Sequence, residues 1–268
     1  MPSPDLVKIT AFVEANIGEF HSKRLVSLGE LKLDKILKRK NPHLFRAKNL
    51  STPETLVRAL LDAHLSSQEE TIFGEFLEKL AIHVCALSSG GWKSGIPGVD
   101  LELDRDGHRY IVSIKSGPHW GNSEQIKKLR SSFKTAAVAL RTSDSKLNVR
   151  GVNGCCYGRD NRPDKGDYDK LCGRRFWEFA SGSAGFFVDV IEPLGHQAKQ
   201  RNEAFAEKYD QVLTLFSREF AATYCVDGKI DWNKIVVLGS AAVAPKLPKL
   251  PKPSLAKPKQ PTPQTRKK

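Results

Sequence analysis

The chain has 268 residues and a formal net charge of +13, which is long enough for one substantial domain or two small ones. Eight of those charges fall in residues 241–268, which hold no acid, so residues 1–240 are only mildly basic at +5. No run approaches the roughly 20 apolar residues of a membrane span, and the N-terminus lacks the basic-then-apolar pattern of a signal peptide.

The first part of the chain has the apolar spacing of helices. The pattern predicts an amphipathic helix over residues 4–22 and a second helical piece over 25–37. The basic stretch 38–49 is either a contact with a DNA backbone or a solvated linker. A capping hydroxyl followed by Pro53 then starts another helix. We therefore predict an all-helical N-terminal subdomain over residues 1–65, for dimerisation or DNA wrapping.

A serine at position 66, followed three residues later by a glutamate, predicts a further helix start. The broad apolar set that follows predicts a well-buried helix to about residue 87. Glu75 and Glu78 lie one turn apart on a neighbouring face of this helix. Plain exposure to solvent is the ordinary alternative for both.

Two short stretches in which apolar and polar residues alternate flank the dipeptide Asp106-Gly107. Glycine tolerates the positive φ of a tight turn, so this pattern predicts a β-hairpin. The two strands are expected over residues 99–104 and 110–115.

The alternation gathers four polar side chains. Asp100 and Glu102 share one face of the first strand, and Ser113 and Lys115 share one face of the second. Carboxylates hold Mg²⁺ and leave room for water and a phosphate oxygen, and the ion lowers the pKa of bound water. A lysine beside the ion orients or deprotonates that water, or stabilises the transition state. The set suits metal-dependent phosphodiester cleavage; an exposed hairpin with a solvated polar face is the alternative.

After the hairpin, Trp120 lies in a loop, where it either packs under the site or approaches a nucleotide; we favour packing. A helix is expected from residue 122 to about 141. Lys127, Arg130 and Lys134 form one basic stripe on it, which is either a phosphate contact or a solvated face.

A strand is expected over residues 147–157, where two glycines indicate a bulge or a close approach of the backbone. The polar loop 159–170 carries Arg159, Arg162 and Lys165. It is either simply exposed or contacts DNA, since arginine forks suit guanine edges.

The remaining elements are a strand near Leu171, a helix at FWEFASG and a largely helical segment over residues 185–225, broken near Pro193. The five cysteines have no zinc spacing, and we expect reduced, buried thiols. The Pro- and Lys-rich tail, 241–268, is expected to be disordered. It either adds nonspecific DNA affinity or only solubilises the chain.

Asp100, a hairpin and then Ser113-Ile114-Lys115 resemble the motif of the PD-(D/E)XK nucleases, in the variant whose second acid is replaced by serine. That variant occurs in several type II restriction endonucleases. The continuation SGPHWGNSEQ is similar to the PmeII-like group, and VRGVNGCCYGRDNRPDKGDYDKLCGRRFWEFASG resembles restriction enzymes that cut GG/CC-centred degenerate sites. The resemblance runs from about Asn41 to Cys225.

The resemblance implies roles for the hairpin residues. Asp100 is expected to bind Mg²⁺, and Lys115 to position or activate the attacking water. Ser113 would give a hydroxyl contact or a weak ligand, and the backbone carbonyl of Ile114 can also bind the ion.

With serine in the usual place, a second carboxylate must come from elsewhere. Glu102 is the nearest by strand geometry. Glu78 is the helix-borne candidate, because a glutamate there in similar nucleases points toward the metal. Glu124 is a third candidate.

The expected fold is α/β, a restriction-endonuclease-like mixed β-sheet flanked by helices, with an α-helical N-terminal subdomain. The expected division is a helical part over 1–65, a nuclease domain over 66–240 and the tail over 241–268.

The expected function is Mg²⁺-dependent type II restriction of double-stranded DNA at a short site. A palindromic site requires two symmetric active sites, so we expect a homodimer, paired in a bacterial cytoplasm with a DNA methyltransferase. A structure-specific repair or recombination nuclease and a catalytically silent DNA-binding protein are the alternatives.

Overall fold

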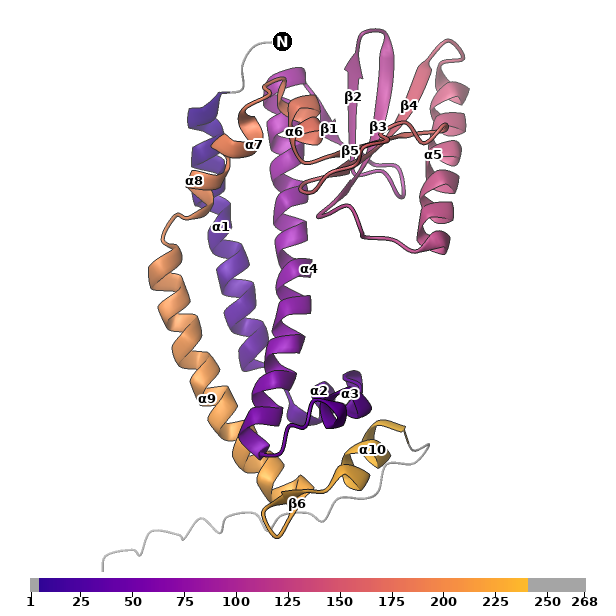
Figure 1. The fold of residues 1–268 in the computed structure, drawn as a ribbon. Helices are drawn as coiled ribbons and strands as arrows, with labels where there is room; N and C mark the ends of the chain where they lie inside the picture. The colour runs from indigo at the N-terminus through magenta and orange to yellow at the C-terminus, as the bar shows by residue number, and fades with distance from the viewer. Residues whose placement is uncertain (1–4, 241–268) are drawn as a thin grey trace, which may run out of the picture.

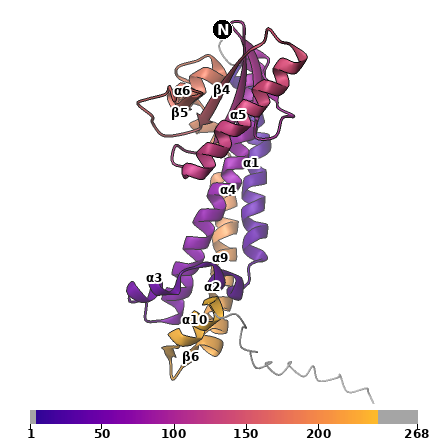
Figure 2. The same ribbon diagram turned by 90° about the vertical axis from the view of Figure 1, so that its right-hand side faces the viewer.

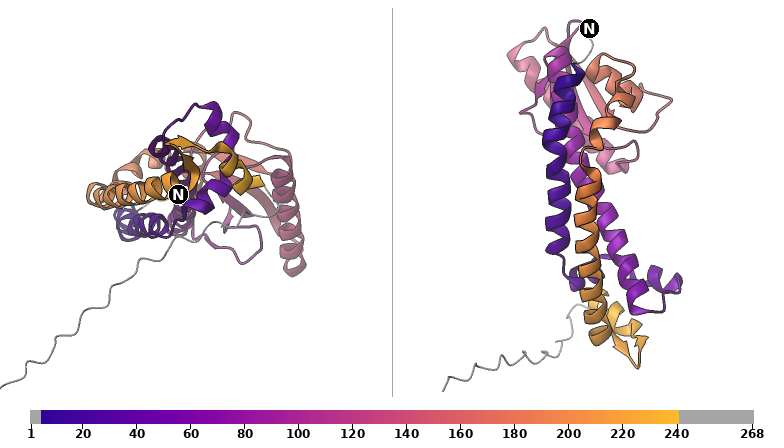
Figure 3. Two further views of the ribbon diagram at one scale, coloured as in Figure 1. Left: turned by 90° about the horizontal axis from the view of Figure 1, so that it is seen from below. Right: turned by 90° about the vertical axis from the view of Figure 1, so that its left-hand side faces the viewer.

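The computed structural model describes residues 5–240, and its frame is a set of three long helices. Helices α1 (Leu6–Gly29), α4 (Pro53–Ser89) and α9 (Ala198–Tyr224) pack against one another along their lengths (Figures 1 and 3). A β-sheet lies beside one end of α4, and short helices lie at the other end. We call these ends the head, residues 76–194, and the foot, residues 28–65 and 205–240.

The head contains a five-stranded mixed sheet in the order β1-β2-β3-β4-β5. The strand pairs β1–β2 and β2–β3 are antiparallel, whereas β3–β4 and β4–β5 are parallel. This sheet flanked by helices confirms the predicted α/β fold. Its elements are β1 (Trp92–Lys93), β2 (Leu101–Arg105), β3 (His108–Lys115), α5 (Ser123–Ser143), β4 (Asn148–Cys155), β5 (Asp169–Cys172) and α6 (Arg174–Ser181).

The hairpin formed by β2 and β3 confirms the prediction from alternating residues. Its turn residues, Asp106 and Gly107, have φ values of 50° and 72°, the left-handed pair that a two-residue hairpin turn requires. The register places Leu101 opposite Val112. Because side chains alternate, this register fixes which residues face each side of the sheet.

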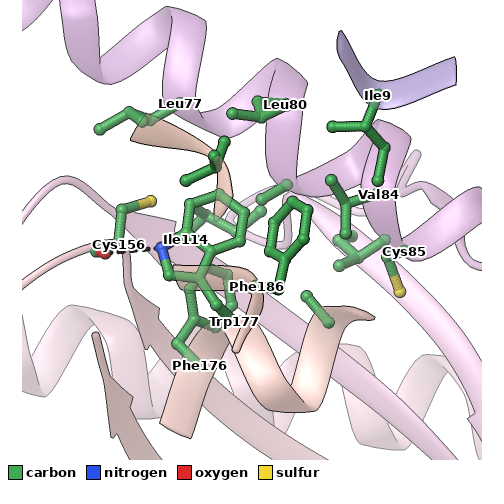
Figure 4. Packing of buried hydrophobic residues seen from close by; sticks show 14 of the residues in the cluster. Ile9, Leu77, Leu80, Val84, Cys85, Ile114, Cys156, Phe176, Trp177 and Phe186 are labelled. Atoms are coloured by element: carbon green, nitrogen blue, oxygen red, sulfur yellow. Dashed lines mark hydrogen bonds between the residues drawn. The ribbon is translucent and has the colours of Figure 1, made fainter. Parts of the chain in front are cut away.

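Helices cover both faces of the sheet. On one face, Val112 and Ile114 pack with α4 and α6 in a single buried cluster. Figure 4 shows Phe176 and Trp177 of α6 among these apolar side chains, with the indole Nε1 of Trp177 donating to the carbonyl of Cys156 at 2.8 Å. On the other face, Ile111 packs against α5. Apolar packing therefore covers much of both faces of the sheet.

The glycines of β4 allow helices to approach the sheet closely. A Cβ on Gly151 would lie 2.8 Å from the ring of Phe133, and one on Gly154 would overlap the ring of Phe176. The predicted close approach of the backbone is therefore confirmed, with an aromatic ring as the approaching group in both cases.

Helix α4 corrects one prediction. The sequence predicted two helices with a new start at Ser66, but the structure has a single helix of 37 residues from Pro53 to Ser89. The hydroxyl of Ser67 donates to the carbonyl of Ala63 at 3.1 Å, so it bonds within the helix instead of capping a new one. No proline or glycine occurs between Glu54 and Thr71 to end the helix.

The N-terminal helices also differ from the predicted boundaries. The first runs on to Gly29, and the second, α2, spans only Leu33–Arg39. The basic stretch after it, expected to be a linker or DNA contact, contains helix α3 (Pro42–Ala47). The side chain of Asn41 accepts from the backbone N–H of His43 at 3.0 Å, and Pro42 occupies the first turn, as a helix start favours.

The segment after α6 is broken as predicted. Helices α7 (Phe186–Asp189) and α8 (Ile191–Leu194) are single turns, and Gln197 adopts a φ of 53° just before α9 begins. A small hairpin, β6 (Cys225–Val226) with β7 (Lys229–Ile230), then leads to α10 (Trp232–Ser240). All five cysteines are free thiols, and four of them are buried.

The foot has its own apolar core, separate from that of the head. Leu33 and Ile36 of α2, Phe45 of α3 and Leu60 of α4 pack with Phe220 and other residues of α9 and α10. Helix α4 contributes to both cores and joins them.

Helix α4 passes without a break through the predicted boundary between residues 65 and 66, and the division into domains stays a prediction. The predicted disordered tail, 241–268, lies outside the described residues. Within residues 5–240, no helix combines the length and apolar character needed to cross a bilayer.

Candidate active site

The carboxylate of Asp100 is fixed where β2 and β3 begin to separate. Its backbone N–H donates to the carbonyl of Val112 at 2.8 Å, which continues the ladder one residue beyond β2. Its Oδ2 accepts the backbone N–H of Ile114 at 2.7 Å and the hydroxyl of Ser113 at 3.3 Å. Two donors therefore hold the carboxylate in place.

Lys115, the last residue of β3, extends to the same place. Its Nζ lies 3.8 Å from Oδ2 of Asp100 and donates to the carbonyl of Ile114 at 2.9 Å. The ammonium also lies 5.6 Å from the ring centroid of Trp120, within cation–π range. The structure thus brings Asp100, Ser113, Ile114 and Lys115 together at one end of the hairpin.

Glu78 approaches this group from α4. Its side chain is half-buried, and its pKa is raised, first by burial and next by the negative charge of Asp100. Lys93 and Lys115 oppose this shift. Asp100 and Lys115 are therefore near enough for their charges to act on the carboxyl group of Glu78. Glu75, one turn earlier, is exposed and forms an ion pair with Lys23 at 2.8 Å.

The other two acids considered for the site have partners elsewhere. Glu102 is 5 % exposed, and it accepts from the hydroxyl of Ser94 at 2.8 Å and from the guanidinium of Arg109 at 3.4 Å. Glu124 is exposed on α5 and pairs with Lys127 at 2.9 Å. Of the three candidates for a second carboxylate, Glu78 is the one that has no ion-pair or hydrogen-bond partner among the described residues.

The donor set is small but suits Mg²⁺. In the described residues, no group of three or more His, Cys, Asp or Glu side chains is placed to hold a metal. Mg²⁺ is usually bound through one or two carboxylates, with water and substrate phosphate as the other ligands. Asp100, Glu78 and the carbonyl of Ile114 meet that requirement with oxygen ligands alone.

A buried amide that the sequence did not reveal supports the site from β4. Asn153 is 1 % exposed; its Nδ2 donates to the carbonyl of Ser113 at 3.1 Å, and its Oδ1 accepts from the indole of Trp120 at 3.0 Å. Asn153 lies opposite Ser113 in the parallel register. Its residue type did not single it out, because β4 also holds Asn148 and Arg150. Trp120 packs at the site, as favoured.

The thiol of Cys156, next to the site, is unreactive. The backbone N–H of Cys156 donates to the carbonyl of Lys115 at 2.9 Å. Burial first, and then the charge of Glu78, raise the pKa of this thiol to about 12. Cys156 therefore stays protonated at neutral pH and acts as a small apolar side chain.

The two regions predicted to contact DNA adjoin each other. Arg130 of α5 pairs with Asp167 of the polar loop at 3.5 Å and lies over the ring of Tyr168. Lys127 and Lys134 of the same helix are exposed. The structure thus joins the α5 stripe and the loop into one surface.

The cations of the loop differ in exposure and in whether they form an ion pair. Arg159 and Arg162 are exposed, whereas Lys165 pairs with Asp160 at 3.1 Å. A pocket of about 730 Å³ begins beside Arg159 and is bounded by Leu77 and Cys156, the neighbours of Glu78 and of the Lys115 strand end. The pocket thus joins the polar loop to α4 and α6, but Asp100, Glu78 and Lys115 do not line it.

Comparison of the sequence with known protein families gives a match. A family model described as type II restriction endonuclease EcoO109I matches residues 7–202, which is 196 of the 268 residues. The match includes α1 except its first residue, the whole five-stranded sheet and every residue of the candidate site. No curated protein sequence gives a significant match to the chain. The chain therefore belongs to the type II restriction endonuclease EcoO109I family, and is a restriction endonuclease with DNA as its substrate.

Proposed function

We propose that the protein is a Mg²⁺-dependent, site-specific endonuclease of the PD-(D/E)XK superfamily, in its PmeII-like group with an S-x-K motif. The observation that carries this proposal is the Asp100 carboxylate, held by two donors with the Lys115 ammonium 3.8 Å away. The half-buried Glu78 supplies the second acid that Ser113 lacks.

Asp100 and Glu78 would hold the ion with their carboxylates, and Ile114 with its backbone carbonyl. Bound Mg²⁺ would lower the pKa of a water molecule and offset the charge that develops on the phosphate. The raised pKa of Glu78 fits this role, because burial beside Asp100 disfavours a second negative charge until a cation is present.

Lys115 acts on the water and the phosphate. Its ammonium now donates to the Ile114 carbonyl, and it is free to turn to a water or phosphate oxygen, since its only ion-pair partner among the described residues is Asp100 at 3.8 Å. There it orients the attacking water and stabilises charge on the phosphate oxygens. Trp120 and Asn153 keep the strand end in place beneath it.

The substrate follows from the family and the surface charges. Exposed Lys127, Lys134, Arg159 and Arg162 lie on the joined α5 and loop surface, where they contact phosphates and base edges. A palindromic site requires a two-fold pair of active sites, so the working form is a homodimer. A DNA methyltransferase protects the host DNA, and both act in a bacterial cytoplasm.

Digestion of plasmid DNA in Mg²⁺ tests the proposal. We expect discrete fragments with uniform ends, and none in EDTA or with Asp100→Asn. The control is Asp104→Asn, since Asp104 is an exposed acid of the same hairpin that pairs with Arg109. Smears or nicks confined to branched DNA would instead indicate a structure-specific nuclease. Binding without cleavage in Mg²⁺ and Mn²⁺ would indicate a silent DNA-binding protein.

A further inference from the structure

The foot carries a concentration of positive charge that the catalytic site does not use. Residues 30–48 contain seven Lys or Arg residues and two acids. Their net charge of +5 equals that of residues 1–240 as a whole. The other described residues together sum to zero, because the +4 of the head, residues 76–194, is balanced by acidic segments elsewhere.

Helix α2 sorts apolar and basic residues onto opposite faces. Leu33, Ile36 and Leu37 are buried in the foot core, at the spacing of one helix face. The cations occupy the remaining positions and are exposed. With those of α3 and its C-cap they form a set that we call the basic foot patch: Lys32, Lys35, Lys38, Arg39, Arg46 and Lys48.

Among the described residues, none of these six cations has a carboxylate partner, although Arg46 lies over the ring of Trp232 and Lys48 over that of Phe45. Asp34, the acid within α2, accepts from the hydroxyl of Tyr224 at 2.8 Å. The positive charge also acts on a neighbouring residue of α4, His64. Its pKa is lowered first by burial and then by the charges of Lys40 and Arg39.

The basic foot patch lies on the same side of α4 as the sheet of the head (Figure 1). Helices α2 and α3 project from α4 on the same side as the sheet and α5, at the opposite end of α4 (Figures 1 and 2). Lys40 donates to the carbonyl of Ala63 at 2.7 Å and so anchors α2 and α3 at that level. Glu78 lies 15 residues further along α4, which is about 22 Å along a helix axis.

We propose that the basic foot patch binds the phosphate backbone of the DNA duplex outside the cleavage site. A duplex that runs along α4 from the head covers about 22 Å in six or seven base pairs, at about 3.4 Å for each. Phosphates are the partner that neutralises clustered lysines and arginines, and they carry no sequence information. This inference rests on the proposed function only in that the same duplex is bound at the head.

The salt dependence of DNA binding tests it without any cleavage. The chain is titrated in Ca²⁺, without Mg²⁺, against a fluorescent 40-base-pair duplex at salt concentrations from 50 to 200 mM. The variant Lys35→Gln/Arg39→Gln removes two cations from α2. We expect its plot of log affinity against log salt to be shallower by about 1.8, at about 0.9 for each phosphate contact, with affinity at least about tenfold lower at 0.1 M salt.

Two further variants make the result specific. Lys199→Gln/Arg218→Gln removes one lysine and one arginine from exposed positions of α9, which lies on the other side of α4 in Figure 1. Its slope should match the unmodified chain. Arg46→Gln/Lys48→Gln, on α3, should repeat the loss seen with the α2 pair, which guards against a folding defect in one helix.

An unchanged slope in both foot variants, or an equal loss in the α9 pair, would overturn the proposal. A change of oligomeric state in sedimentation, with the slope unchanged, would overturn it too and assign the patch to a second copy of the chain. Failure of the proposed function appears separately, as absence of discrete plasmid fragments, and leaves this salt slope as it is.

Discussion

The head and the foot of this protein use polar residues in opposite ways. The head buries the polar side chains of Glu102, Ser113 and Asn153 beside its sheet. The foot buries only apolar side chains apart from tyrosines, and presents its cations outward. Buried polar groups cost stability unless each finds a partner. The contrast indicates that reaction geometry is fixed inside the head, whereas the foot supplies charge alone.

The largest expected effect is the loss of Lys115. Lys115→Ala should lower the cleavage rate by about 10³-fold or more, since it removes both an ammonium beside the reacting phosphate and the group that orients water. Binding of DNA and the melting temperature should change little. Lys199→Ala, an exposed lysine of α9, is the control and should keep full activity. Cleavage that persists in Lys115→Ala would take this residue out of the mechanism.

A core substitution in the foot separates stability from chemistry. Phe220 is fully buried in the foot cluster, so Phe220→Ala should cost about 3–5 kcal/mol of unfolding free energy. Denaturant melts measure this loss. Leu215 of the same helix is 60 % exposed, and Leu215→Ala should cost almost nothing. Below its melting temperature the Phe220 variant should cleave at the normal rate; a rate that fell with stability would link foot packing to catalysis.

A smaller effect is expected at the support beneath the site. Trp120→Phe keeps an aromatic ring but removes the N–H that donates to Asn153. The buried Oδ1 of Asn153 is then left with only the weak thiol donor of Cys155, at a cost of about 1–3 kcal/mol. We expect a lower melting temperature and a cleavage rate several-fold lower. Trp92→Phe, at a partly exposed indole, is the comparison. Equal effects in the two variants would show that Asn153 needs no partner from Trp120.

The smallest effect is a gain in stability. The folded state raises the pKa of Glu78 above its ordinary value of 4.5, so the folded protein binds this proton more tightly than the unfolded chain does. The charged form therefore costs stability at neutral pH, and the cost disappears as pH falls through the raised pKa toward 4.5. Glu78→Gln should melt about 2 °C higher at pH 7.5 without metal, with the difference vanishing near pH 4.

The same Glu78→Gln variant should fail to cleave DNA, so that stability and activity move in opposite directions. Glu75→Gln, one turn away and paired with Lys23, should do neither. A lower melting temperature for Glu78→Gln at neutral pH would show that the carboxylate is already satisfied within the protein.

The hairpin of the head could be predicted because its signals are local. Alternating residues and Asp106-Gly107 set both the turn and the register within a few residues. The support from Asn153 could not be predicted, because it depends on the parallel pairing of β3 with β4 across helix α5. Sequence spacing alone does not reveal which distant strands become neighbours.

Two local signals were ambiguous for physical reasons. A serine hydroxyl bonds a backbone carbonyl four residues earlier as readily as it caps a helix, so Ser66 and Ser67 gave a false helix start in α4. Strand spacing made Glu102 the nearest acid to Asp100, but the choice of partner depends on Arg109 and Ser94. The proposed role of Glu78 depends on the packing of α4 on the sheet, which spacing within the hairpin cannot reveal.

The account depends most on Asp100 and Glu78 sharing one divalent cation. Calorimetric titration of Mg²⁺ into the full-length chain, compared with Glu78→Gln and Glu102→Gln, tests this most directly. We predict at least about tenfold weaker binding for Glu78→Gln, as is typical when a metal site loses a supporting group, and binding close to normal for Glu102→Gln. The reverse order, with Glu102→Gln losing the ion and Glu78→Gln keeping it, would contradict the account.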